Sequence, residues 1–278
     1  MKKILVPVDF SEHSEYALEV AASLAKQWKS EIVVLHMMGL SEAVFTKDDS
    51  QEFMEAQFYM KLAKKRFTDF LKKPYLEGIK ISETVQNYKI FSEINNVAKE
   101  QNIDLIVMGS HGAGGLSEIF VGSNTEKVVR SAEVPVLVIK NRIADFQMKK
   151  VVFGFDFRIE SLPAYQKAIS FLASFNVETH VVYVNRTGIN FMSSSEIQEQ
   201  INTFLRVAHH NDVPSHVHAH QRADYTIESG IYNYAKEVHA DTIVVATHGR
   251  SGLAHFFKGS IGEDLANHAS LPVITFKF

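Results

Sequence analysis

The sequence predicts an α/β protein built from two tandem copies of one domain, each around a parallel β-sheet. Apolar runs typical of buried strands alternate with segments of helical periodicity along the whole chain. The run Ile4-Leu-Val-Pro-Val-Asp-Phe10 has a counterpart in Val151-Val-Phe-Gly-Phe-Asp-Phe157, and a glycine-rich segment after residue 109 recurs after residue 246. Alternating strands and helices favour a parallel sheet with helices on both faces.

The first copy predicts strands and helices in strict alternation. The strands are expected at Lys3–Val8, Ile32–Met37, Ile79–Ile90, Leu105–Gly109 and Val136–Ile139. The helices are expected from a cap at Ser11 to about Trp28, at Gln51–Leu71, at Phe91–Gln101 and at Ser123–Ser131. In the second helix, Phe53, Phe58, Phe67 and Phe70 recur at near-helical spacing, which predicts that they belong to the core.

The second copy repeats this plan. Its strands are expected at Lys150–Phe155, Val177–Val184, Ser215–His220, Thr242–Ala246 and Val273–Phe276. Its helices are expected at Leu162–Ser174, Ser195–His210, Ile227–Val238 and Ser260–His268. The predicted domains are residues 1–141 and 148–278, joined by a short linker.

Composition narrows the class of protein. The 278 residues are 46% hydrophobic and 22% charged, with a net charge of −3 and no long basic run, so no nucleic-acid partner is expected. There are no cysteines, which excludes disulfides and thiolate chemistry. No apolar run reaches the length of a membrane span, and Asp9 and Glu12 interrupt the N-terminal apolar run too early for a signal peptide. We therefore expect a cytoplasmic protein without a membrane partner.

The glycine-rich segment of the first copy is the strongest functional motif. Gly109 and Gly112 are followed, after nine residues, by Gly122 and Ser123, and the segment joins a predicted strand to a predicted helix. Such a junction exposes main-chain N–H groups and the positive end of a helix dipole, which suits a phosphate. Asp9, at the end of the first strand, is suited to accept hydrogen bonds from ribose hydroxyls.

These motifs resemble those of the universal stress protein family (UspA-like), in its nucleotide-binding branch. The resemblance rests on Lys2-Lys-Ile-Leu-Val-Pro-Val-Asp-Phe-Ser-Glu12, Val33-Val-Leu-His-Met37, Gly109-x-x-Gly112-x9-Gly122-Ser123 and Pro135-Val-Leu-Val-Ile139. It covers nearly the whole chain as two domains. It implies a Rossmann-like, HUP-type fold with an open five-stranded parallel sheet, order 3-2-1-4-5, in each domain. It further implies an intramolecular pseudo-dimer of the two halves through their fifth strands, and leaves a homodimer open.

The resemblance also implies a set of ligand contacts. In the first copy, Pro7, Val8 and Asp9 would border adenine and ribose, and Met37 would be an apolar wall. The phosphates would be held by Gly109, Gly112, Gly122, Ser123 and Asn124, whereas His111 would either contact a phosphate or cap a turn. The matching positions of the second copy are Asp156, Val184, Gly249, Gly259, Ser260 and Ile261. Two departures, Ala246 for the first glycine and Gly154 for Pro7, leave nucleotide binding by the second copy open.

The resulting interpretation is an ATP-binding stress or regulatory protein in which the nucleotide acts as a conformational or assembly signal, with Mg²⁺ left open. A slow ATP hydrolase or a nucleotidyl- or phosphoryl-transfer enzyme is one alternative, and a nucleotide-free interaction scaffold is another. No glycine directly follows the first strand and no Gly-Lys-Ser/Thr motif occurs, so no dedicated catalytic residues are assigned. His216, His218 and His220 alternate along a predicted edge strand, where a polar exposed face is favoured over a zinc site.

Overall fold

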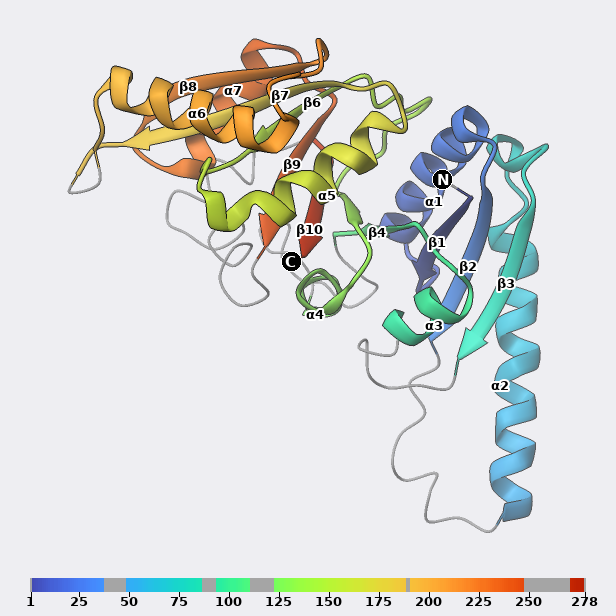
Figure 1. The fold of residues 1–278 in the computed structure, drawn as a ribbon. Helices are drawn as coiled ribbons and strands as arrows, with labels where there is room; N and C mark the ends of the chain where they lie inside the picture. Colours follow the sequence, from blue (N-terminus) through green and yellow to red (C-terminus); the bar gives the residue numbers. More distant parts are fainter. Residues whose placement is uncertain are drawn as a thin grey trace. The chain divides into compact units, whose positions relative to one another are not determined.

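The computed structural model describes residues 2–37, 49–86, 94–110, 123–188, 191–247 and 271–277. The chain divides into two compact units, Met1–Phe146 and Gln147–Phe278, and each contains a parallel sheet with helices on its two faces (Figure 1). The predicted fold class is therefore confirmed. Within the described residues, no helix combines the length and the apolar character that a membrane span requires.

The first unit holds five parallel strands. They are β1 (Lys3–Val8), β2 (Glu31–Met37), β3 (Ile81–Gln86), β4 (Leu105–Gly109) and β5 (Val136–Ile139). Their order in the sheet is β3-β2-β1-β4-β5, and every pairing is parallel. This is the order that the family resemblance implies. Because β2 and β4 flank β1, the connections that follow β1 and β3 run in opposite directions across the sheet.

The described residues of this unit form four helices beside the sheet: α1 (Glu12–Trp28), α2 (Asp49–Phe70), α3 (Ile94–Glu100) and α4 (Ser123–Ser131). The predicted cap of α1 is confirmed, because the Ser11 side chain accepts a hydrogen bond from the N–H of Ser14 at 3.3 Å. Helix α1 packs against β1, β4 and the 3₁₀ turn that follows α2. Asn95 of α3 donates to the main-chain oxygen of Ser131 at 2.8 Å, which joins α3 to the end of α4.

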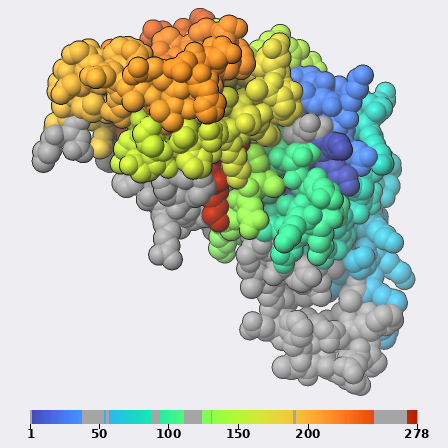
Figure 2. All heavy atoms as spheres, in the orientation of Figure 1, coloured from blue at the N-terminus to red at the C-terminus, as the bar shows by residue number. Residues whose placement is uncertain are grey.

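The second unit repeats the arrangement. Its strands are β6 (Lys150–Gly154), β7 (Glu178–Arg186), β8 (Val217–Asp224), β9 (Thr242–Thr247) and β10 (Val273–Lys277), in the order β10-β9-β6-β7-β8. Its described helices are α5 (Leu162–Ala173), α6 (Ser194–His209) and α7 (Ile227–Glu237). Atoms of α5 and α6 lie side by side on one face of this unit (Figure 2), where Tyr165 and Phe204 are in ring contact. The predicted helix Ser260–His268 lies outside the described residues.

Several strand ends differ from the prediction by one or two residues, and the end of β8 differs by four. Strand β8 begins at Val217 and continues to Asp224, beyond the expected end at His220, and His216 precedes it. The polar residues after His220 concealed the extension, which pairs in register with β7 as far as Arg186 and Asp224. An edge strand that is exposed on one side has no continuous apolar run to mark its end.

The duplication extends to main-chain hydrogen bonds. A carboxylate oxygen of Asp104 accepts bonds from two consecutive N–H groups at the start of β1, at 2.6 and 3.0 Å. Asp241 accepts the matching pair at the start of β6, at 2.9 and 2.8 Å. The residue after the candidate ribose-binding aspartate has positive φ in both copies, 63° at Phe10 and 52° at Phe157. The same turn therefore follows the first strand of each unit.

Helix α2 corrects the prediction for its aromatic residues. Phe67 and Phe70 are buried as predicted, but Phe58 is 63% exposed, so its assignment to the core was wrong. The side chain of Phe53 lies outside the described residues. The 22 residues of α2 span about 33 Å, whereas a six-residue strand such as β3 spans about 20 Å. The strand is thus too short to cover the whole apolar stripe of the helix.

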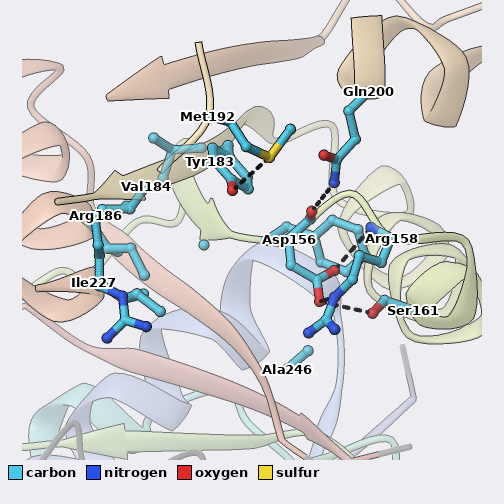
Figure 3. A pocket seen from close by; sticks show the side chains of 14 residues that line it. Asp156, Arg158, Ser161, Tyr183, Val184, Arg186, Met192, Gln200, Ile227 and Ala246 are labelled. Carbon is cyan, nitrogen blue, oxygen red and sulfur yellow. Dashed lines mark hydrogen bonds and ion pairs between the residues drawn. The ribbon is translucent and has the colours of Figure 1, made fainter. Parts of the chain in front are cut away.

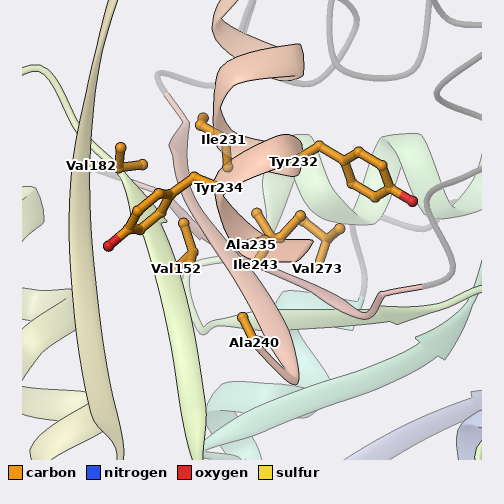
Figure 4. Close-up of a cluster of buried hydrophobic side chains, with 9 residues drawn as sticks. All are labelled: Val152, Val182, Ile231, Tyr232, Tyr234, Ala235, Ala240, Ile243 and Val273. Atoms are coloured by element: carbon orange, nitrogen blue, oxygen red, sulfur yellow. The ribbon is translucent and has the colours of Figure 1, made fainter. Parts of the chain in front are cut away.

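Two apolar clusters lie in the described part of the second unit. Phe204 of α6 is fully buried. The centroid of its ring lies 5.3, 5.6 and 5.0 Å from the ring centroids of Phe155, Phe157 and Tyr165. Across the sheet, buried side chains of α7 pack onto β6, β7 and β9 (Figure 4). A Cβ at Gly154 would lie 2.1 Å from Cδ1 of Ile231 in α7. Glycine at the position of Pro7 therefore lets α7 approach β6.

A histidine cluster lies on β7 and β8. His180 is 3.0 Å from the Tyr234 hydroxyl through Nδ1 and 2.7 Å from the Glu178 carboxylate through Nε2. The His220 ring stacks on His180 at 5.2 Å, and its buried Nε2 has no hydrogen-bond partner among the described residues. Burial, and then the neighbouring His180 and His218, lower the pKa of His220. Among all the residues that the structure describes, no group of three or more His, Asp or Glu side chains is arranged to hold a metal ion.

Acidification is therefore expected to destabilise the second unit. The folded pKa of His220 lies below its ordinary value of 6.5, so the unfolded chain takes up the proton first as pH falls through that value. The contribution of neutral His220 to the folding stability of the second unit is complete above pH 6.5 and decreases below that pH. Urea unfolding followed by circular dichroism should give lower stability near about pH 5.5 than near about pH 7.5. His220→Gln should reduce this dependence, and an unchanged pH profile in that variant would contradict the assignment.

Candidate functional site

A cavity of about 530 Å³ opens at the carboxyl ends of β6, β7 and β9 in the second unit (Figure 3). Its volume is within the range of small-molecule sites. Strand β6 lies between β7 and β9, so this is the place where the strand order reverses. Ligands of open α/β sheets bind at such points. The cavity is therefore the strongest candidate site among the described residues.

Asp156 anchors one wall of the cavity. Its Oδ1 accepts from the N–H of Arg158 at 3.1 Å, and its Oδ2 accepts from Nε of Arg158 at 2.8 Å and from Oγ of Ser161 at 3.2 Å. The hydrogen bond that Arg158 donates to the Asp156 carboxylate raises the pKa of Arg158. Gln200 of α6 donates to the main-chain oxygen of Asp156 at 2.9 Å. The turn after β6 is thus held by its own side chains and by α6.

The opposite wall is formed by β7 and the segment that follows it. Val184 and Met192 contribute apolar surface, and Tyr183 donates a hydrogen bond to the Met192 sulfur at 3.7 Å. The Asn185 amide holds the main chain of Met192 through two bonds of 2.8 and 3.3 Å. Arg186 also lines the cavity, which therefore carries two guanidinium groups and one carboxylate (Figure 3).

The matching turn of the first unit has the same main-chain hydrogen bond and the same sign of φ, but it carries Ser11 in place of Arg158. Oδ1 of Asp9 accepts from the N–H of Ser11 at 3.1 Å and from its hydroxyl at 2.6 Å. His36 Nδ1 lies 2.9 Å from the main-chain oxygen of Val8, which joins the ends of β1 and β2. Met37 is the last residue of β2, so Asp9 and Met37 lie at the same edge of the sheet.

Gly109 ends β4 in close contact with the start of α1. A Cβ at this position would lie 2.7 Å from the main-chain oxygen of His13, so the contact requires glycine. Thr125, buried in the first turn of α4, donates to the main-chain oxygen of Gly109 at 2.8 Å. This bond fixes the N-terminus of α4 beside the end of β4. Asn124 is exposed in the same turn.

The described site residues predicted from the sequence lie at the carboxyl edges of the two sheets or at the start of α4. In the first unit these are Pro7, Val8, Asp9, Met37, Gly109 and Asn124, and in the second they are Asp156 and Val184. Ser123 begins α4, but its side chain is outside the described residues. The remaining predicted site residues lie wholly outside the described residues: His111, Gly112, Gly122, Gly249, Gly259, Ser260 and Ile261.

Sequence reasoning did not single out Arg158, Arg186 or Met192, which line the cavity with Asp156 and Val184. Alignment of the two copies offered one signal, because Arg158 stands where the first copy has Ser11. Met192 lies in a connecting segment and no repeated pattern marks it. Ala246, at the position of Gly109, also lines the cavity, so the second unit accommodates a methyl group at the end of β9.

Comparisons with known proteins agree with the duplication. The model of the family described as "Universal stress protein family" matches residues 1–140 and again residues 148–277. Universal stress protein MJ0577 of Methanocaldococcus jannaschii is 32% identical over 155 residues, 51% of this chain and 96% of that protein. Universal stress protein YxiE of Bacillus subtilis is 32% identical over 147 residues, 50% of this chain and 98% of that protein. Each of these relatives thus has about the length of one copy.

A solved structure shares the fold of the whole chain. The crystal structure of a universal stress protein from Archaeoglobus fulgidus has a TM-score of 0.64 at 22% identity, and the match covers 99% of this chain and 98% of that one. At this identity the likeness supports the architecture and carries no information about a ligand.

Proposed function

The chain belongs to the universal stress protein family, and from this premise we propose that it is a regulatory protein that binds ATP through its first copy. The proposal rests on one observation above all. The glycines at 109, 112 and 122, followed by Ser123, connect the end of β4 to the start of α4. A main chain without Cβ atoms at the N-terminus of a helix suits the phosphates of a nucleotide.

The surroundings of this segment support the proposal. Gly109 ends β4 next to β1, where the strand order reverses, and Thr125 fixes the start of α4 beside it. Asp9 and Met37 lie at the carboxyl ends of the neighbouring strands, with a carboxylate for ribose hydroxyls and an apolar side chain for a base. We propose that the matching residues of the second copy, with the altered loop, also border a nucleotide.

In this proposal the nucleotide acts as a conformational or assembly signal. A ligand shifts such an equilibrium only if its affinity differs between the two states. Pairing of the two copies within one chain, or of two chains, stays a prediction. Mg²⁺ is a proposed companion of the phosphates, because divalent cations commonly bridge nucleotide phosphates.

Gly122→Val is expected to weaken ATP binding by the first copy at least tenfold, or about 1.4 kcal/mol, because a side chain would occupy the approach of a phosphate. Isothermal titration calorimetry of the full chain measures this effect. Gly259→Val, the matching change in the second copy, is the control and should leave the first-copy affinity unchanged. Circular dichroism verifies that both variants are folded. Equal ATP affinity in wild type and Gly122→Val would refute the proposed phosphate site.

Hydrolysis is the alternative that a second measurement decides. Purified protein incubated with ATP and Mg²⁺ should produce no ADP or AMP above the background rate if the nucleotide serves as a signal. Sustained turnover that Gly122→Val removes would instead identify an ATP-consuming enzyme that uses the same segment.

A further inference from the structure

The two units differ at one residue beside the carboxylate that follows their first strand. In both, the residue two positions after the aspartate donates its N–H to Oδ1 at 3.1 Å, and the residue between them has positive φ. The main chain is therefore alike, and the difference is the side chain. Ser11 is small and neutral, whereas Arg158 is long and cationic.

Arg158 changes what the carboxylate offers to a ligand. Oδ2 of Asp156 already accepts hydrogen bonds from Nε of Arg158 and from Ser161, so acceptor positions that a ribose hydroxyl would use are occupied. Nε is the one side-chain nitrogen of Arg158 with a hydrogen-bond partner among the described residues. The Arg158 side chain is 69% exposed, and its two terminal nitrogens are left for another acceptor. Asp156 thus orients a cation at the cavity wall.

The chemistry of a ligand for such a wall follows from nucleotide-binding sheets in general. A carboxylate at the end of a strand accepts hydrogen bonds from ribose hydroxyls, whereas a nearby arginine accommodates a phosphate on the ribose. Guanidinium groups pair with phosphates through two parallel hydrogen bonds. Arg186 adds a second positive charge to the lining, while Val184 and Met192 offer apolar surface to a base.

We propose that the cavity of the second unit selects an adenine nucleotide that carries a phosphate on a ribose hydroxyl, and that Arg158 is the specificity-determining residue. The proposal rests on the proposed function, because it assumes that the family fold of this chain holds adenine nucleotides. The two copies would then recognise different nucleotides. The first would bind ATP, and the second would bind a nucleotide phosphorylated at the 2′ or 3′ position.

Three isomers provide the probes: adenosine 2′,5′-bisphosphate and adenosine 3′,5′-bisphosphate, which have equal charge, and ADP, which carries one negative charge less when fully ionised. ATP, with the same full charge as the two bisphosphates, is the control for charge. In calorimetric titrations of the full chain, one of the ribose-phosphorylated isomers should occupy a site at which ADP binds at least tenfold more weakly. Arg158→Ser should lower the affinity for that isomer at least tenfold and leave ADP binding unchanged or stronger. Because the Arg158 side chain is largely exposed and serine occupies the matching position of the first copy, the variant is expected to fold.

The outcomes separate the inference from its premise. If ATP binds but no isomer is preferred, or if Arg158→Ser leaves the preference intact, the inference is wrong and the proposed function stands. If ATP and all three probes fail to bind the folded wild-type protein, both are wrong. Arg158→Lys keeps the charge but not the paired hydrogen bonds, so it should fall between wild type and Arg158→Ser. Equal losses for ADP and for the preferred isomer would indicate a purely electrostatic effect and overturn the specific role.

Discussion

Phe204→Ala is expected to destabilise the second unit by about 3–5 kcal/mol, the range for removal of a buried aromatic side chain. The Phe204 ring is fully buried and contacts Phe155, Phe157 and Tyr165. Truncation would leave a cavity among rings that the sheet and the turn after β6 hold in place. Because Phe155 also lines the candidate site, the cavity wall is expected to loosen as well.

Urea unfolding monitored by circular dichroism measures the loss. The single tryptophan, Trp28, belongs to α1 of the first unit, so its fluorescence provides an internal reference that should change little. Phe58→Ala is the matched control, because that ring is 63% exposed and its removal should alter stability by no more than about 0.5 kcal/mol. Comparable losses in the two variants would contradict the role assigned to the aromatic cluster.

Gly109→Ala is expected to destabilise the first unit by about 1–3 kcal/mol, the usual cost of overpacking. The added Cβ would lie 2.7 Å from the carbonyl oxygen of His13 and 2.8 Å from its carbonyl carbon. These are main-chain atoms of the first turn of α1, and they cannot rotate away as a side chain would. The end of β4 must then move, and the bond from Thr125 to Gly109 moves with it.

Trp28 fluorescence reports this transition directly, because the tryptophan lies in the affected unit. The reciprocal change, Ala246→Gly, supplies the control. It removes a methyl group that the second unit accommodates, so its cost should stay near the about 0.5–1 kcal/mol of a glycine in a regular element. ATP binding by Gly109→Ala should also weaken. If Gly109→Ala is as stable as wild type, α1 shifts at little cost in free energy and the close contact does not require glycine.

Much of the fold could be predicted from the sequence, because buried parallel strands form continuous apolar runs. The first strand matched its prediction at Lys3–Val8, and Ser11 capped α1 as expected. The end of β8 was not readable, since its partner strand determines where it ends. The exposure of Phe58 was missed for a related reason. Helical periodicity identifies a stripe, but the length of the neighbouring strand determines how much of the stripe is covered.

The candidate site was predictable where it depends on position in the repeat and less so where it depends on side-chain partners. Asp156 and Val184 were selected because they match Asp9 and Met37, and both line the cavity. The engagement of Asp156 by Arg158 was not foreseen, because a residue's place in a motif does not reveal which neighbour its side chain bonds. Comparing the copies at Ser11 and Arg158 reveals the substitution, whereas the bond itself comes from the structure.

The shared turn that carries Ser11 in one copy and Arg158 in the other has an evolutionary consequence. In a symmetric assembly of identical subunits, one substitution alters every copy of a turn at once, so no copy can change while another keeps the original side chain. Fusion of two copies into one polypeptide removes that constraint. One of two equivalent positions can then change while the other stays the same, and the two copies are always made in a one-to-one ratio.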